Sequence, residues 1–157
     1  MTTLVTARFR AEAIIVDSES ATVGGYRLLS NQGVVNGDVV DLLPGAPCIL
    51  IGDNTIVRAW ADVGGLAATD GLVFVQTPPT GSCMLRSQGR VDLTTAEWDA
   101  VTGEIGGLFP GALYYVGLAP GTLTSSPPFV AGQTVCQIGK AFSPTSFVIE
   151  IGAPILL

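Results

Sequence analysis

Short apolar runs separated by turn residues make up most of this chain. Glycine, proline and Asn-Gly or Asp-Gly pairs recur at intervals of roughly 8 to 15 residues, and the runs between them are rich in Val, Ile, Leu and Thr. This rhythm of short strands and tight turns is typical of β-sandwiches and barrels. We therefore expect an all-β fold, built as a compact antiparallel sandwich or barrel.

Residues 146–151 show the alternation expected of a half-buried strand. Phe147, Ile149 and Ile151 fall on one face of an extended chain, and Glu150 falls on the other. This pattern predicts a strand whose apolar face packs on the core.

A tight hairpin is predicted around Asn36-Gly37. The pair lies between two short apolar runs, residues 33–35 and 38–40. Asn-Gly is the favoured pair for a two-residue hairpin turn because both positions tolerate a positive φ. We expect the two runs to pair with each other.

One short helical turn is predicted near residues 94–101. Thr94 followed three residues later by Glu97 is a capping box, in which each side chain satisfies a backbone N–H of the other residue. Gly103 ends the segment. The apolar side chains expected to face the sheet are Trp98 and Val101.

The first residues differ from the rest of the chain. Residues 1–20 mix apolar and charged side chains without a clear period and end in a polar break. They predict an N-terminal arm or an edge strand. Residues 21–157 are expected to form the β-domain, and the length of the chain suits one domain.

Charge is scarce and mostly negative. Only 13% of the 157 residues are charged, 48% are apolar, and the net charge is −6. Such a low charge content predicts that partner molecules cover part of the surface. Nucleic-acid binding is not expected, because it requires clustered lysines and arginines and the chain has a single lysine, Lys140.

No stretch has the length of about 18 consecutive apolar residues that a membrane span requires, and the first residues lack the order of a signal peptide. We therefore expect a soluble protein with no membrane partner. The three cysteines, Cys48, Cys83 and Cys136, are far apart and odd in number, which predicts buried free thiols in a reducing cytoplasm.

The absence of histidine argues against most enzymatic chemistry. It removes the Ser-His-Asp and Cys-His arrangements and the commonest transition-metal ligand. No glycine-rich phosphate-binding loop is present either. We expect no catalytic residues, no cofactor and no metal site, and the chain is not predicted to be an enzyme.

Four groups of residues are candidate sites, and for each we favour a structural interpretation. Acidic residues near the helix could form a glycosidase pair, but a cap and solvated side chains explain them. A Ser-Lys dyad lacks its motif. A third group could bind calcium, but the sequence motif of calcium-binding loops is missing and ordinary turns use the same residue types. Aromatic residues could bind a glycan, yet most aromatics supply core. The acidic group is Asp92, Glu97, Asp99 and Glu104, and the dyad would pair Lys140 with Ser143 or Ser146. The calcium candidates are Asp53, Asn54 and Asp70. The aromatic group is Tyr114, Tyr115, Trp60, Trp98 and Phe109.

The last part of the chain carries the only specific family signal. A Pro-Gly strand start precedes two tyrosines, a Gly-x-Leu-Thr hairpin follows, and a Gly-x-Ala-x-Ser bend comes before the apolar terminus. This order, over residues 88–157, resembles a module of tailed-bacteriophage virion proteins, found in capsid decoration (cement) proteins and in fibre-like proteins. The residues that carry it are Pro110-Gly111, Tyr114-Tyr115, Gly121, Leu123-Thr124, Gly139, Ala141 and Ser143.

The resemblance implies a structural protein. A decoration protein would assemble as a homotrimer in the host cytoplasm, bind the major capsid protein at the outer surface of the head, and bridge neighbouring subunits. The alternative is a tail fibre, receptor-binding or adaptor component. The family pattern supplies no catalytic residues to carry over.

Overall fold

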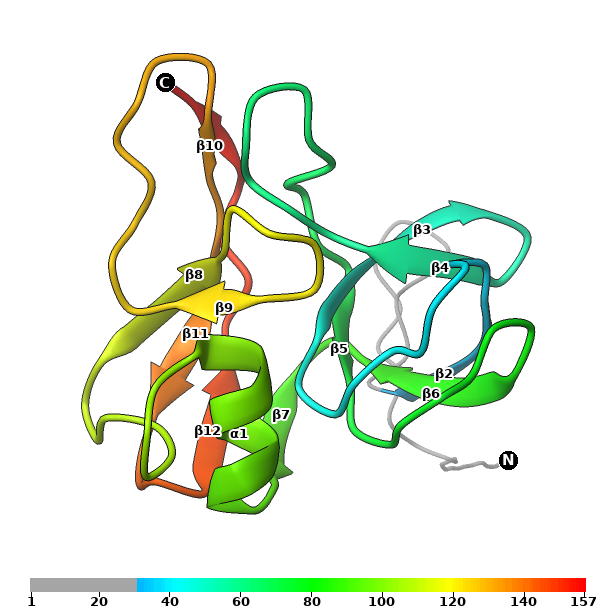
Figure 1. Cartoon of the computed structure of the whole chain (residues 1–157), viewed down its shortest axis with the longest axis horizontal. Coiled ribbons are helices and arrows are strands. Elements are labelled where there is room, and N and C mark those ends of the chain that lie inside the picture. The colour runs from blue at the N-terminus through cyan, green and yellow to red at the C-terminus, as the bar shows by residue number, and fades with distance from the viewer. Residues whose placement is uncertain (1–30) are drawn as a thin grey trace, which may run out of the picture. The chain divides into compact units, whose positions relative to one another are not determined.

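The computed structural model describes residues 31–157, and these residues form an all-β fold with one short helix (Figure 1). The expected arm at residues 1–20 lies outside the described residues. The helix is α1 (Thr95–Thr102). The strands are β2 (Asn31–Asn36), β3 (Pro47–Gly52), β4 (Thr55–Arg58), β5 (Gly71–Val73), β6 (Ser82–Arg86), β7 (Gly89–Asp92), β8 (Leu113–Val116), β9 (Leu123–Thr124), β10 (Thr134–Val135), β11 (Gln137–Ala141), β12 (Ser146–Ile149) and β13 (Ile155–Leu156).

The first half of the described chain forms a closed barrel in the strand order β2-β4-β3-β5-β6. Most of its pairs are antiparallel, as expected, but β2 and β4 run parallel, with Val35 opposite Thr55 and Asn36 opposite Ile56. Closure leaves few free strand edges. The barrel core is made by Cys48, Ile56, Leu72, Val73 and Leu85, all at most 2% exposed.

The predicted hairpin at Asn36-Gly37 is wrong. The Asn36 side-chain amide is buried and donates to the carbonyls of Val40 (2.9 Å) and Thr77 (3.0 Å), while its Oδ1 accepts from Asp38 N (2.8 Å). Gly37 passes so close to β4 that a Cβ there would collide with the Thr55 side chain. The buried amide therefore organises a bend, and β2 pairs with β4 instead of with residues 38–40.

The second half forms a five-stranded sheet in the order β7-β12-β11-β8-β9. The Phe147 ring on β12 packs against Trp98 of α1 (centroids 5.6 Å apart) and against Tyr114 of β8 (6.0 Å). Phe147 and Ile149 are buried and Glu150 is exposed, which confirms the predicted alternation, although the strand ends at Ile149. Helix and sheet thus share one core.

Helix α1 confirms the prediction made from its capping residues. Thr94 Oγ1 accepts from Glu97 N (3.2 Å), and the Glu97 carboxylate accepts from Thr94 N (3.4 Å). Gly103 ends the helix with φ of 73°, in the left-handed region that glycine adopts at little cost. Within residues 31–157 this eight-residue helix is far from the length needed to cross a membrane.

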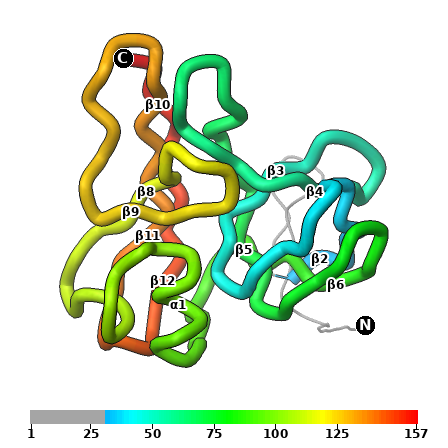
Figure 2. Tube along the Cα trace, viewed as in Figure 1, coloured from blue at the N-terminus to red at the C-terminus, as the bar shows by residue number. Residues whose placement is uncertain are grey.

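Backbone hydrogen bonds join the segment after β4 to the second half of the chain. Ala59 O accepts from Gly121 N (2.9 Å), Ala61 N donates to Gly117 O (2.8 Å), and Ala61 O accepts from Thr134 N (3.0 Å). The chain ends on the short ladder of β10 and β13, which run side by side (Figure 2). Residues 59–61 are therefore fixed on both sides by main-chain contacts.

Candidate functional site

The four carboxylates weighed as a glycosidase pair each have a structural partner. Glu97 caps α1, and Asp99 accepts from the backbone N–H groups of Gly106 (3.0 Å) and Gly107 (2.7 Å). Asp92, on the edge strand β7, is bound by the Ser146 hydroxyl and by Arg90 Nε (2.8 Å). These two contacts, the Ser146 hydrogen bond first, hold the pKa of Asp92 below its usual value of 3.8.

Glu104 lies in a polar network at the end of β8. Its carboxylate accepts from the Tyr114 hydroxyl (2.7 Å) and from Ser125 Oγ (3.0 Å), and the same hydroxyl accepts from Phe109 N (3.0 Å). Burial raises the pKa of Tyr114 to about 12, with a further contribution from Glu104. The network fixes the loop that precedes β8, and each of its polar atoms already has a partner from the chain itself.

The residues of the Ser-Lys candidate all have structural surroundings, the interpretation favoured from the sequence. Lys140 is exposed on β11, where its cross-strand neighbours are Val148 and Leu113. Ser143 Oγ accepts from Ser146 N (3.0 Å), and the Ser146 hydroxyl binds Asp92. The Ser143 hydroxyl therefore stabilises the turn between β11 and β12, and the Ser146 hydroxyl joins β12 to β7.

Two of the calcium candidates, Asp53 and Asn54, are turn residues as predicted, whereas Asp70 is not in a turn and directly precedes β5. Asp70 Oδ2 accepts from Leu50 N (2.9 Å), Asp53 O accepts from the Thr55 hydroxyl (3.2 Å), and Asn54 has φ of 53° in the turn between β3 and β4. No group of three potential metal ligands occurs among residues 31–157.

The aromatic residues do not form one surface. Trp98 and Tyr114 are fully buried, Trp60 and Tyr115 are half-buried, and Phe109 is exposed. The two adjacent tyrosines face opposite sides of β8, as the alternation of a strand predicts. Trp98 and Tyr114 therefore belong to the core and cannot contribute to a glycan-binding surface.

The cysteines are free thiols, as predicted, but only two of the three are buried. Cys48 and Cys136 are buried and Cys83 is half-buried. Burial raises the pKa of Cys48. Burial also raises the pKa of Cys136, although a hydrogen bond from the Thr69 backbone acts in the opposite direction. A thiol held protonated is a poor nucleophile, which suits a packing role.

The described surface is notable instead for exposed apolar side chains. At the C-terminal end, Val63 packs over Gly132, where an added Cβ would lie 3.2 Å from it, and Gly132 N donates to Leu157 O (3.0 Å). We call this region the apolar tip. Its exposed members are Val63, Phe129, Val130, Ile155, Leu156 and Leu157.

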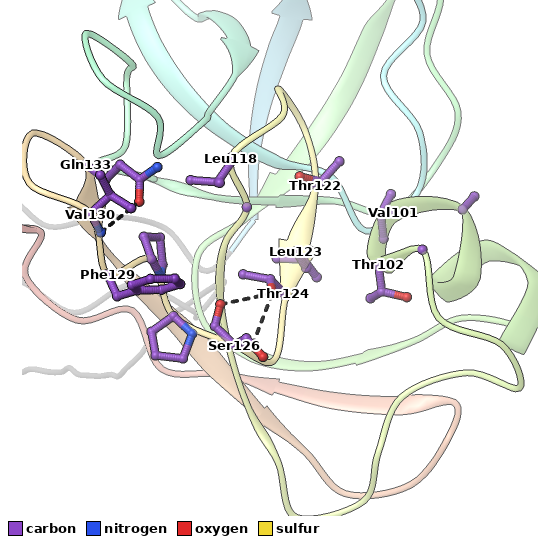
Figure 3. Close-up of a pocket in the computed structure, with 15 residues that line it drawn as sticks. Val101, Thr102, Leu118, Thr122, Leu123, Thr124, Ser126, Phe129, Val130 and Gln133 are labelled. Carbon is purple, nitrogen blue, oxygen red and sulfur yellow. Dashed lines mark hydrogen bonds between the residues drawn. The ribbon is translucent and has the colours of Figure 1, made fainter.

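A groove of about 490 Å³ adjoins the apolar tip, between the C-terminal end of α1 and the hairpin of β8 and β9. We call it the α1–β9 groove. Buried Val101 and Leu123 contribute to its lining, together with exposed Leu118 and Phe129. Figure 3 shows Phe129 on one side and Val101 and Thr102 on the other.

No local sequence pattern indicates the α1–β9 groove, because its residues come from three separate segments. The one local signal was Phe129-Val130 after Pro127-Pro128, an apolar pair in a segment otherwise typical of a turn. Proline restricts the backbone of this loop. The apolar pair is exposed at the surface and is not packed into the core.

Comparison with known proteins adds no relative. No protein-family profile matches the chain, and no curated protein is significantly similar to it.

Proposed function

We propose that the chain is a structural protein of a tailed-phage virion, and specifically a capsid decoration protein without enzymatic activity. In this role it assembles as a homotrimer in the host cytoplasm and binds the major capsid protein on the outer surface of the head. The placement on a virion rests on the resemblance of residues 88–157. The role in assembly is supported by the exposed apolar side chains of the described residues.

The observation that carries the proposal is the exposure of large apolar side chains in several regions. Phe129 is 88% exposed and Leu156 72% exposed at the apolar tip, while Phe142 is 68% exposed in the turn after β11. Monomeric proteins rarely leave extended apolar patches uncovered, and obligate interfaces are core-like. Several such regions on one small domain suit a protein that contacts both its own copies and a shell.

Mass action gives the mechanism. A protein that binds the assembled shell but not its dissociated subunits stabilises the shell by the free energy of that binding. Bridging two neighbouring subunits adds a contact that must break before they separate. The pressure of packaged DNA is then resisted without any chemical step.

The direct test is co-sedimentation. Purified protein is mixed with undecorated heads of the phage that encodes it, the heads are pelleted, and bound protein is quantified against head number. We expect saturable binding and a higher temperature of head disruption. Protein that stays in the supernatant at every concentration contradicts the decoration role.

The N-terminal arm has its own test. Removing residues 1–17 should weaken attachment to heads while leaving the β-domain folded, as judged by circular dichroism. Unchanged occupancy would show that these residues are not the attachment arm.

The tail-fibre alternative makes the opposite prediction. A fibre, receptor-binding or adaptor component should not bind heads and should bind host cells, their glycans or purified tails. The genes beside the coding sequence provide a second discriminator, since a neighbouring major capsid gene favours decoration and neighbouring tail genes favour the alternative.

A further inference from the structure

We propose that Asn36-Gly37 is a deamidation site that the closed barrel protects, so that Asn36 reacts only while the barrel is open and the product then keeps it open. The inference goes beyond the proposed function and does not depend on it. In a flexible chain, asparagine loses its side-chain amide fastest when glycine follows, because glycine has no side chain to hinder the reacting backbone nitrogen. Of the three asparagines in the sequence, only Asn36 precedes a glycine.

Deamidation is an attack by the chain on its own side chain. The Gly37 nitrogen bonds to Asn36 Cγ, the bond from Cγ to Nδ2 breaks, and Nδ2 leaves as ammonia with the proton that Gly37 N gives up. Water then opens the cyclic imide at either of its carbonyls, adding a hydroxyl to carbon and a hydrogen to nitrogen. The product is aspartate or isoaspartate, whose new carboxyl group loses a proton at neutral pH.

The barrel requires both residues of this labile pair. The side-chain amide of Asn36 donates to the carbonyls of Val40 (2.9 Å) and Thr77 (3.0 Å). A carboxylate makes neither hydrogen bond, because it has no proton to donate. A Cβ on Gly37 would collide with the Thr55 side chain, so the close approach to β4 requires glycine. Packing therefore places the pair that deamidates most readily inside the folded barrel.

Hydrogen bonds of the folded barrel hold the groups that would react. Gly37 N donates to Ile56 O (2.8 Å), Asn36 N donates to Gly81 O (2.9 Å), and Asn36 O accepts from Thr80 N (2.9 Å). Attack requires Gly37 N to lose its proton and the Asn36 side chain, which is 1% exposed, to rotate toward it. These bonds must break first, so the rate of deamidation follows the fraction of molecules in which the barrel is open.

The product does not fit the site that asparagine occupied. A carboxylate at position 36 would turn its oxygens toward the carbonyl oxygens of Val40 and Thr77, and those carbonyls would lose the donor that satisfies them. The site is buried, so a negative charge without a partner there is costly. Isoaspartate adds one atom to the main chain and moves Gly37 away from Ile56. Deamidation therefore removes a molecule from the folded population permanently.

The first test compares the rate of deamidation in the folded and the unfolded protein. The full chain is incubated at pH 8 in native buffer and in denaturing guanidinium chloride, and samples are digested at acid pH, which halts the reaction. Mass spectrometry of the peptides then measures conversion of each asparagine separately. Asn54 is the internal reference for any effect of the denaturant, because it lies exposed in the turn between β3 and β4 and is followed by threonine.

We expect Asn36 to react ahead of Asn54 in the denatured chain and to react roughly 100-fold or more slowly in native buffer, since a stable domain is open only a small fraction of the time. The rate at Asn54 should change much less between the two conditions. Equal rates at Asn36 in native and denaturing buffer would overturn the protection by the barrel.

The second test asks whether deamidated chains fold again. Protein held in guanidinium chloride at pH 8 until about half of Asn36 has reacted is diluted into native buffer, and the folded monomeric or oligomeric fraction is separated by size-exclusion chromatography from unfolded and aggregated chains. We expect the folded fraction to be depleted at least about tenfold in molecules modified at Asn36, and not in those modified at Asn54. Molecules modified at Asn36 that appear equally in both fractions would show that the product is compatible with the barrel. The variants Asn36→Asp and Asn54→Asp repeat the comparison without the chemistry: the first should lower the urea midpoint of unfolding and the second should not, and an Asn36→Asp protein as stable as the wild type would overturn the one-way exit.

Discussion

The carboxylate of Asp38 lies 2.7 Å from Nε of Arg58 and joins the bend after β2 to the end of β4. A second oxygen of Asp38 accepts from Arg58 Nη2 (3.1 Å), which makes the pair bidentate, and Arg58 N donates to the same carboxylate (3.2 Å). The stem of Arg58 also lies against Gly121, where a Cβ would be 2.8 Å from Cδ. One ion pair therefore fixes the bend and orients a side chain that packs on the hairpin of β8 and β9.

Replacing Asp38 with asparagine should destabilise the protein by about 1 to 2 kcal/mol at pH 7, since a charge-assisted contact at a partly exposed site is lost. Partial burial raises the pKa of Asp38, but the hydrogen bonds and charge of Arg58 outweigh it and hold the pKa below 3.8. The stabilisation is therefore present above pH 3.8 and is lost as the pH falls through the lowered value. Urea unfolding from pH 2 to 7 measures it.

The control for this charge change is Asp53→Asn, at an exposed turn position. It should show little loss of stability at pH 7. An Asp38→Asn protein as stable as the wild type at pH 7 would show that the ion pair contributes nothing.

Tyr114→Phe should destabilise the protein by about 1 to 3 kcal/mol, because Phe109 N and the Glu104 carboxylate each lose a hydrogen-bond partner. The wild type should also lose stability as the pH rises from 10 to 12, since the folded chain retains a proton that the unfolded chain gives up. Unfolding in urea at pH 8 to 11.5 tests both effects. Tyr115→Phe, on the opposite face of β8, is the control and should keep the alkaline slope.

Thr94→Ala should cost about 1 kcal/mol, because the N-cap hydroxyl that accepts from Glu97 N disappears. Thr94→Ser retains that hydroxyl and should stay within experimental error of the wild type. Thermal unfolding followed by circular dichroism compares the two, and equal losses in both variants would mean that the methyl group of Thr94, rather than the cap, matters.

Gly139→Ala should destabilise the five-stranded sheet by about 1 to 3 kcal/mol, because an added methyl group is forced into a packed site. A Cβ at Gly139 would collide with the carbonyl oxygen of Val148 and lie 2.9 Å from the Phe147 ring. Gly52→Ala, where nothing lies within 4 Å of the added atom, is the control. Denaturant unfolding of the two variants should separate them clearly.

Sequence-based predictions were correct where the interactions that decide the structure join residues close together in the chain. The capping box of Thr94 and Glu97 acts over three residues, so the sequence predicted the helix and both of its ends. The strand with Phe147 and Ile149 was predictable because a buried face requires alternation. The Asn36 bend was not, because Thr77, 41 residues away, accepts one of its hydrogen bonds.

The α1–β9 groove and the parallel pairing of β2 with β4 have the same origin. Val101, Leu123 and Phe129 belong to different elements, and no local pattern states that they meet. Parallel pairing likewise depends on where β4 enters the barrel, and this is set by the intervening strand β3.

The main-chain contacts of Ala59 and Ala61 have a consequence for how this protein can evolve. Because these bonds use backbone carbonyls and amides, any residue other than proline that fits the space preserves them. The exposed side chains of the apolar tip and of the groove rim can therefore change without loosening the connection between barrel and sheet. A lineage could alter what this surface recognises while inheriting the same internal frame.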